Sequence, residues 1–156
     1  QALCRTKTVR GEPFDKLRPG RVEGSHATSV KKMYRNIEKT LKELTATLSE
    51  ELKGFVNSIV LYGSVARNQA TEDSDIDIMV VMPDNMEAYR KVSRISYSID
   101  LKNSTVTSAI CFTPEELTTL VEDGSPFIED VLTEGVILYD DGTFQELRTK
   151  MLGTSR

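Results

Sequence analysis

One stretch near the middle of the chain decides the fold, and it reads IVLYGSVARNQATEDSDIDIMVV from Ile59 to Val81. Two apolar runs enclose a polar loop, and Asp75 and Asp77 interrupt the second run. A buried carboxylate costs several kcal/mol of stability unless it is paired or bound to a metal. Two acids in an apolar strand therefore indicate a site for a cation.

The two aspartates share one face of the predicted strand. Successive side chains on a strand point to opposite faces, so Asp75 and Asp77 lie on one side. Ile76, Ile78 and Val80 then face the core. Two neighbouring carboxylates repel each other unless a cation lies between them, and oxygen ligands at this spacing suit Mg²⁺.

A Gly-Ser pair, Gly63 and Ser64, closes the first apolar run. A helix start at this place turns backbone N–H groups outward, and the missing side chain of Gly63 lets a phosphate approach closely. By itself the pair also fits a tight turn, and the two aspartates by themselves also fit an exposed edge strand. The two features in this order favour a site for a metal-bound nucleoside triphosphate.

The rest of the chain predicts an α/β (α+β) fold, a small mixed sheet backed by helices. Apolar residues at spacings of three and four predict the helices, and β-branched runs predict the strands. Gly, Pro and N-cap residues mark the ends of these elements. The predicted strands are Ser58–Tyr62, Ile76–Met82, Thr105–Phe112 and Val136–Tyr139, and the predicted helices cover 29–52, follow Asn85, begin after Thr113 and Ser125, and include 144–151.

Composition indicates a soluble globular protein of the cytoplasm, with 38% apolar and 28% charged residues among 156. It has no apolar run long enough to span a membrane, two cysteines and one histidine, His26. Residues 1–28 are predicted to be an irregular basic leader, either disordered or a non-native extension, ahead of one domain at 29–152. The residues from 23 onward hold 14 Lys and Arg against 22 Asp and Glu, so nucleic acid is not expected as the main partner.

The stretch LYGSVARNQATEDSDIDIMVV resembles the signature of the polymerase-beta-type nucleotidyltransferase superfamily. The resemblance covers about residues 30–140 and is closest to the minimal nucleotidyltransferases, which often pair with HEPN-domain partners in prokaryotes. It implies that Gly63 and Ser64 hold the triphosphate and that Arg67 contacts a phosphate. It also implies that Asp75 and Asp77 coordinate Mg²⁺, two ions in an active enzyme.

The reaction implied by the resemblance is nucleotidyl transfer, in which an acceptor hydroxyl attacks the α-phosphorus of ATP or another NTP and pyrophosphate leaves. The usual pattern has a third carboxylate on the next core strand. The corresponding position here is Ser108, in TVTSAICF, and the nearest candidate for the third acid is Asp100. The tail GSPFIEDVLTEGVILYD resembles a nearby branch of the family that also lacks this acid.

Two hypotheses follow for the function. The first is an active Mg²⁺-dependent nucleotidyltransferase that transfers a nucleoside monophosphate, AMP from ATP, to a hydroxyl on a protein or small molecule. The second is a catalytically degenerate domain that binds a nucleotide or a partner, as in the antitoxin of a toxin-antitoxin pair. The paired aspartates favour the first hypothesis, and Ser108 favours the second.

Overall fold

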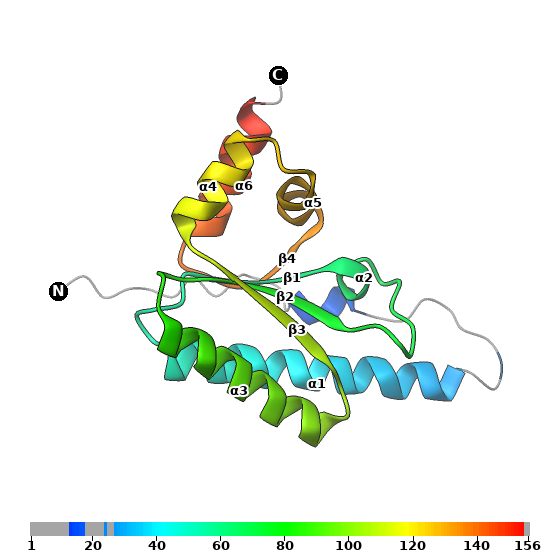
Figure 1. The fold of residues 1–156 in the computed structure, drawn as a ribbon. Coiled ribbons are helices and arrows are strands. Elements are labelled where there is room, and N and C mark those ends of the chain that lie inside the picture. The colour runs from blue at the N-terminus through cyan, green and yellow to red at the C-terminus, as the bar shows by residue number, and fades with distance from the viewer. Residues whose placement is uncertain (1–12, 18–23, 25–26, 155–156) are drawn as a thin grey trace.

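The structure is a computed structural model, and it describes residues 13–17, 24 and 27–154 (Figure 1). Most of the predicted leader, including His26, therefore lies outside the described residues. The elements along the chain are η1 (Pro13–Lys16), α1 (Ala27–Glu51), β1 (Ser58–Tyr62), α2 (Gly63–Ala66), β2 (Ile76–Val81), α3 (Met86–Asn103), β3 (Thr107–Phe112), α4 (Pro114–Glu122), α5 (Pro126–Glu134), β4 (Val136–Asp140) and α6 (Thr143–Thr154).

The four strands form one mixed sheet in the order β3-β2-β1-β4. β1 pairs antiparallel with both β2 and β4, whereas β2 pairs parallel with β3. A parallel pair needs a long crossover, and α3 supplies it between β2 and β3. The predicted small mixed sheet backed by helices is confirmed.

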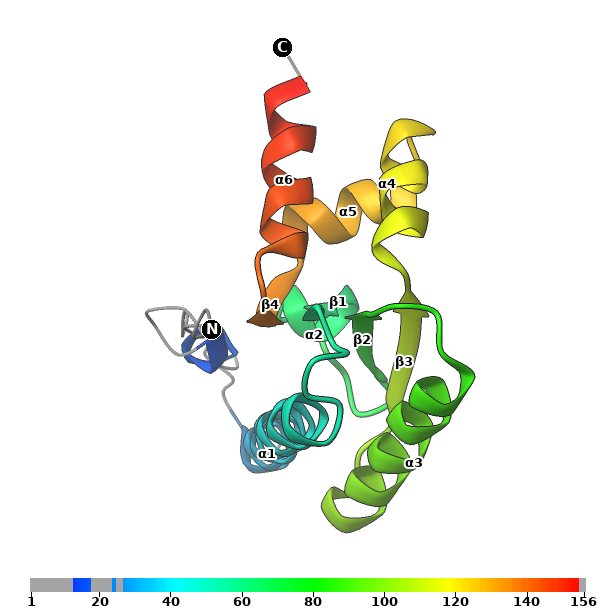
Figure 2. The same ribbon diagram turned by 90° about the vertical axis from the view of Figure 1, so that its left-hand side faces the viewer.

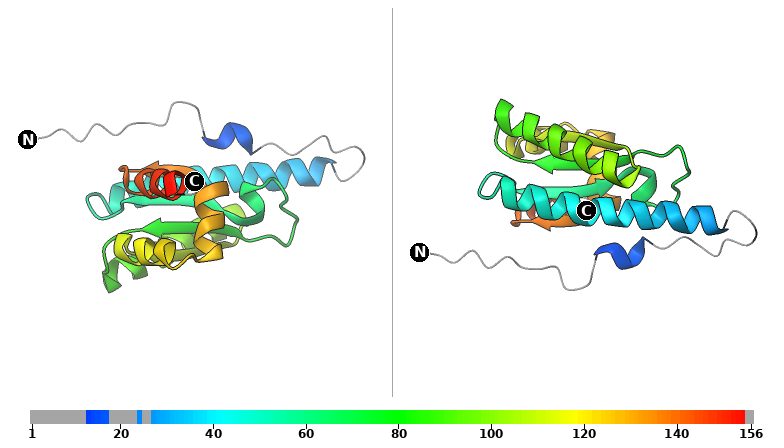
Figure 3. Two further views of the ribbon diagram at one scale, coloured as in Figure 1. Left: turned by 90° about the horizontal axis from the view of Figure 1, so that it is seen from above. Right: turned by 90° about the horizontal axis from the view of Figure 1, so that it is seen from below.

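Helices cover both faces of the sheet, as Figures 1 and 3 show. α1 and α3 lie on one face, where leucines of α1 such as Leu41 and Leu44 pack with Ile59 and Ile78 in a first apolar core. α4, α5 and α6 lie on the other face, and their buried side chains form a second apolar core. The two central strands, β1 and β2, therefore contribute side chains to both cores.

The face of the sheet that carries the aspartates is partly covered by helices. Ile76, Ile78 and Val80 point into the first core, as predicted. Met79 and Val81 lie on the aspartate face, and both are buried under α4, α5 and α6 in the second core. The acids thus occupy the end of β2 that these three helices leave uncovered.

The predicted helix starts are confirmed by their hydrogen bonds. The side chain of Asn85 accepts from the N–H of Ala88 at 2.9 Å and caps α3. Thr113 and Glu116 form a reciprocal capping box at the start of α4.

None of the helices in the described part of the chain combines the length and apolar character that a membrane crossing requires.

The third strand begins two residues later than predicted, at Thr107 rather than Thr105. Ser104 has a left-handed backbone with a φ of 56°, so the chain turns sharply after α3. The hydroxyl of Thr105 donates to the carboxylate of Asp100 within this turn. Local side-chain bonds of this kind compete with strand pairing, which explains the late start.

Candidate functional site

Asp77 lies at the centre of the candidate site, in the middle of three neighbouring strands. Its register partners are Tyr62 on β1 and Ser108 on β3. Asp75 comes just before β2 and is exposed, while Asp77 is half-buried. Burial raises the pKa of the Asp77 carboxyl, the charge of Asp75 raises it further, and the charge of Arg67 opposes both effects. The structure therefore brings the two predicted acids together in a position where they repel.

Gly63 begins α2 immediately after β1 and lies against Asp77. Its backbone φ of +77° is in the left-handed region that favours glycine. A Cβ added at Gly63 would overlap Oδ2 of Asp77 and lie 3.1 Å from its Cγ. Glycine is thus required at this position for two reasons, the backbone conformation and the space taken by the carboxylate. Ser64 follows in the same turn, so the predicted Gly-Ser pair and the predicted acids form one site.

Arg67 ends α2 and lies at the same corner of the sheet. Its guanidinium is half-exposed, and Nη1 lies 3.4 Å from Oε2 of Glu134 at the end of α5. Nε donates to the side-chain oxygen of Gln69, also at 3.4 Å. The positive charge of Arg67 acts to lower the pKa of the Asp77 carboxyl, against the effects of burial and of Asp75. The structure therefore places Arg67 at the site, where its guanidinium is paired with Glu134 of α5.

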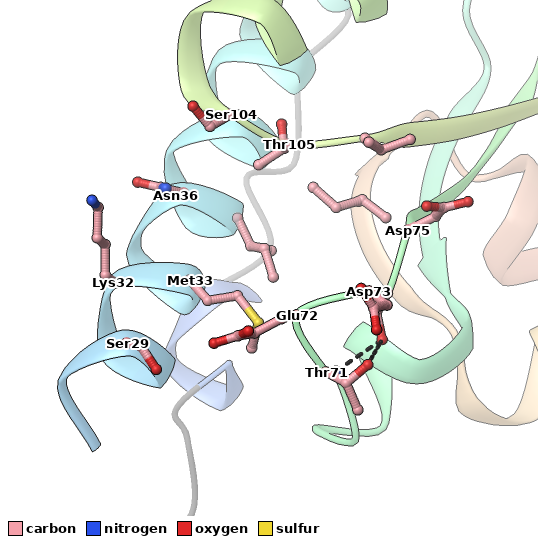
Figure 4. A pocket seen from close by; sticks show the side chains of 14 residues that line it. Ser29, Lys32, Met33, Asn36, Thr71, Glu72, Asp73, Asp75, Ser104 and Thr105 are labelled. Atoms are coloured by element: carbon pink, nitrogen blue, oxygen red, sulfur yellow. Dashed lines mark hydrogen bonds between the residues drawn. The ribbon is translucent and has the colours of Figure 1, made fainter. Parts of the chain in front are cut away.

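A short turn carries the chain from α2 into Asp75. The N–H of Thr71 donates to the hydroxyl of Ser74 at 2.8 Å, and the N–H of Ser74 donates to the carbonyl of Thr71 at 3.0 Å. Beside this turn, α1 and the segment 104–106 border a cavity of about 540 Å³ (Figure 4). Asp75 lies at the edge of the cavity, and its carboxylate points away from the side chains of α1.

Ser108 lies beside Asp77 on β3, at the position where the third carboxylate was expected. The register pairs the two residues directly, and Ser108 is exposed. Within the described ranges, no set of three His, Cys, Asp or Glu side chains is arranged to hold one metal ion. The site therefore has two carboxylates and a hydroxyl where the family pattern has three carboxylates.

Asp100 does not join the two acids. Its carboxylate accepts from the hydroxyl of Thr105 at 2.7 Å and from the N–H and the hydroxyl of Thr107, both at 2.8 Å. Thr107 pairs with Ile76, so it shares the face of the first core, whereas Ser108 shares the face of Asp77. Asp100 thus stabilises the turn between α3 and β3 on the opposite side of the sheet.

Two aromatic residues at the site were not anticipated from the sequence. Tyr62, the register partner of Asp77, packs edge-to-face with Phe127 of α5, with ring centroids 5.5 Å apart and planes at 82°. Burial and the charge of Asp77 together raise the pKa of the Tyr62 hydroxyl. The two rings are 65 positions apart in sequence, so no local pattern could have paired them. The one available signal was an aromatic residue directly after the Ser-Pro helix start.

This chain is similar to several known proteins. A family model described as "Polymerase beta, Nucleotidyltransferase" matches residues 34–143. A Methanocaldococcus jannaschii protein named "Putative protein adenylyltransferase" is 36% identical over 104 residues, which cover 67% of this chain and 99% of that protein. A second protein of the same name and organism is 25% identical over 85 residues, covering 53% of this chain and 86% of that protein.

Among solved structures, one described as "the toxin-antitoxin with AMP-PNP" is similar at 18% sequence identity with a TM-score of 0.48. The similarity covers 71% of this chain and 83% of that chain. The family model spans the Gly-Ser turn and both aspartates, and the first relative is matched over nearly all of its own length. This chain therefore belongs to the polymerase-beta-type nucleotidyltransferase superfamily, as the sequence motif predicted.

Proposed function

We propose that the protein is a Mg²⁺-dependent nucleotidyltransferase that transfers AMP from ATP to a hydroxyl group of a protein. The observation that carries this proposal is the contact between the Gly63 turn and Asp77, because it joins a phosphate-binding backbone to the acid pair. The names of the two relatives support ATP as the donor and a protein as the acceptor. A small-molecule acceptor is the alternative that the sequence leaves open.

The acid pair fits a divalent metal ion. The charge of Asp75 raises the pKa of Asp77, so a cation between the two carboxylates would remove an existing repulsion. Hard carboxylate oxygens are the ligands that Mg²⁺ prefers. Asp75 and Asp77 would hold the ion, which when bound supplies charge neutralisation at the phosphate oxygens.

The other residues of the site bind and orient the nucleotide. The backbone N–H groups of the turn at Gly63 and Ser64 donate to phosphate oxygens beside the Asp77 carboxylate, which fills the space that a side chain at Gly63 would take. The guanidinium of Arg67 adds a charged hydrogen bond to a phosphate. Positioning of this kind supplies most of the rate in phosphoryl transfer.

The acceptor approaches over β3, where Ser108 is exposed. The hydroxyl oxygen of the acceptor forms a bond to the α-phosphorus of ATP. The bond from that phosphorus to the oxygen that bridges it to the β-phosphate breaks, and pyrophosphate leaves. The proton of the hydroxyl passes to water. Among the described residues, no third His, Cys, Asp or Glu joins the pair in a metal-binding group.

The proposal is tested by incubating the protein with Mg²⁺, ATP labelled at the α-phosphate and the protein encoded by the neighbouring gene. A double variant, Asp75→Asn with Asp77→Asn, is the control. Label transfer that disappears in the control supports the enzyme. A protein without affinity for Mg·ATP contradicts the nucleotide site altogether.

A second candidate function is favoured by Ser108. A nucleotidyltransferase domain without its third carboxylate can serve as a nucleotide- and partner-binding module, as an antitoxin does beside a HEPN-type protein. In this case ATP binds with Mg²⁺, yet no label is transferred. The same experiment therefore separates the two functions.

A further inference from the structure

Phe127 is a large apolar side chain that the fold does not bury. It lies in the first turn of α5 and is 40% exposed, whereas Ile128, Val131 and Leu132 of the same helix are buried in the second core. A helix that packs on a sheet needs an apolar side chain only on its inner face. Packing in the second core therefore does not account for phenylalanine at this position.

The position of Phe127 places it at the nucleotide site. Its ring packs against Tyr62, and Tyr62 is the register partner of Asp77 on the adjacent strand. The other end of the helix reaches the phosphate side, where Glu134 contacts Arg67. Figure 2 shows α5 above the sheet and next to α2. One side of α5 thus borders the site from Phe127 to Glu134.

Phe127 is connected to the acids through Tyr62. The backbones of Tyr62 and Asp77 are one strand spacing apart, about 4.8 Å, and the ring of Phe127 packs against the Tyr62 ring with the centroids 5.5 Å apart. In a nucleotide the base is also set apart from the α-phosphate, by the ribose. An NTP with its phosphates at the Gly63 turn therefore has its base within reach of Phe127.

We propose that the ring of Phe127 stacks on the base of the bound nucleotide, so that α5 binds the base while the α2 turn binds the phosphates. Tyr62 holds the ring in place through the edge-to-face contact. Any base offers a π face, and the larger face of a purine gives more overlap, so ATP and GTP bind better than CTP and UTP. This inference rests on the proposed nucleotide site.

The test compares the affinities of two ligands, Mg·ATP and Mg·tripolyphosphate, by isothermal titration calorimetry. Tripolyphosphate has the phosphates but no base. Phe127→Ala is expected to weaken ATP about tenfold, the usual effect of losing one stacked ring. Its affinity for tripolyphosphate is expected to stay within twofold of the wild type.

Two further variants separate stacking from packing. Phe127→Leu keeps an apolar side chain against Tyr62 but has no π face, so it should bind ATP as weakly as Phe127→Ala. Phe127→Trp retains the π face and should restore the affinity. Phe55 is the matched control, since it is also 40% exposed but lies in the segment after α1, and Phe55→Ala should leave both affinities unchanged.

Either of two results would overturn the stacking role. One is full ATP affinity in Phe127→Leu, which would mean that only packing matters. The other is an equal loss for ATP and tripolyphosphate in Phe127→Ala, which would mean that the ring supports the phosphate side. Failure of the nucleotide site itself looks different, because the wild type would then bind neither ligand.

Discussion

The carboxylate of Asp77 occupies the space that a Cβ at Gly63 would need. This contact joins the two halves of the sequence motif, which are separated by thirteen intervening residues, into one site. Glycine is therefore necessary at position 63 for a steric reason as well as for its positive φ.

The substitution Gly63→Ala is expected to abolish ATP binding and to lower the free energy of unfolding. A left-handed backbone costs an alanine about 1–2 kcal/mol, and the overlap with Asp77 adds to this. Gly54→Ala is the matched control, because Gly54 has a φ of +82° and a Cβ there meets no atom within 4 Å. It should show the backbone cost alone and retain ATP binding. Equal behaviour of the two variants in urea melts and ATP titrations would contradict the role of the contact.

The substitution Asp77→Asn is expected to stabilise the metal-free protein at neutral pH. Because the pKa of Asp77 is raised in the fold, the folded protein binds its proton more tightly than the unfolded chain does. The carboxyl therefore destabilises the fold as the pH rises through the raised pKa. Thermal melts should show the gain at pH 7 and little difference below the ordinary aspartate pKa of about 3.9. A variant that is less stable than the wild type at pH 7 would oppose this account.

The substitution Glu134→Gln is expected to tighten ATP binding, because it releases Arg67 for the phosphates. Exposed ion pairs contribute no more than about 1 kcal/mol, so the gain should not exceed about fivefold. Glu38→Gln, which breaks the exposed Glu38–Lys42 pair on α1, is the control and should leave ATP affinity unchanged. Weaker ATP binding in Glu134→Gln would show instead that Glu134 positions Arg67 for the nucleotide.

The substitution Asp100→Asn is expected to lower stability while ATP affinity is retained. The variant loses charged acceptors for Thr105 and Thr107, at a cost of about 1–3 kcal/mol. Urea unfolding and ATP titration check the two halves of this prediction. The opposite pattern, unchanged stability with lost Mg·ATP affinity, would make Asp100 the third acid after all.

The substitution Ser108→Asp is expected to raise the rate of label transfer, by about tenfold or more, because it adds a carboxylate beside Asp77. Without metal the same variant should be less stable than the wild type, since three carboxylates then repel one another. Ser108→Asn has a similar shape without the charge and should show neither effect. A transfer rate that is identical in all three proteins would mean that a third acid does not limit the reaction.

Local patterns in the sequence were sufficient to predict most of the fold. The apolar run that forms β2 and the Thr-Pro-Glu-Glu start of α4 depend on neighbouring residues, and both elements are confirmed. The position of Ser108 followed from the family resemblance and its spacing before the Thr-Pro-Glu-Glu start, and the strand register pairs it with Asp77. The choice of Asp100 rested on proximity in sequence, and the turn after α3 takes its side chain to the other face of the sheet.

The contribution of α5 could not be predicted, because it depends on contacts between distant segments. Phe127 reaches Tyr62 and Glu134 reaches Arg67 only after the helix has packed across the sheet. The second core also depends on contacts between segments that are distant in sequence, so it was not predicted either. Met79 and Val81 alternate with apolar neighbours on β2, so periodicity alone did not show that helices cover part of the aspartate face.

The most direct test of the nucleotide site is a calorimetric titration of ATP in the presence and absence of Mg²⁺. We expect one ATP to bind per chain in the presence of Mg²⁺, and this binding to disappear without Mg²⁺ and in the Asp75→Asn/Asp77→Asn double variant. Binding that is unchanged in the double variant, or no binding by the wild-type protein with Mg²⁺, would contradict it.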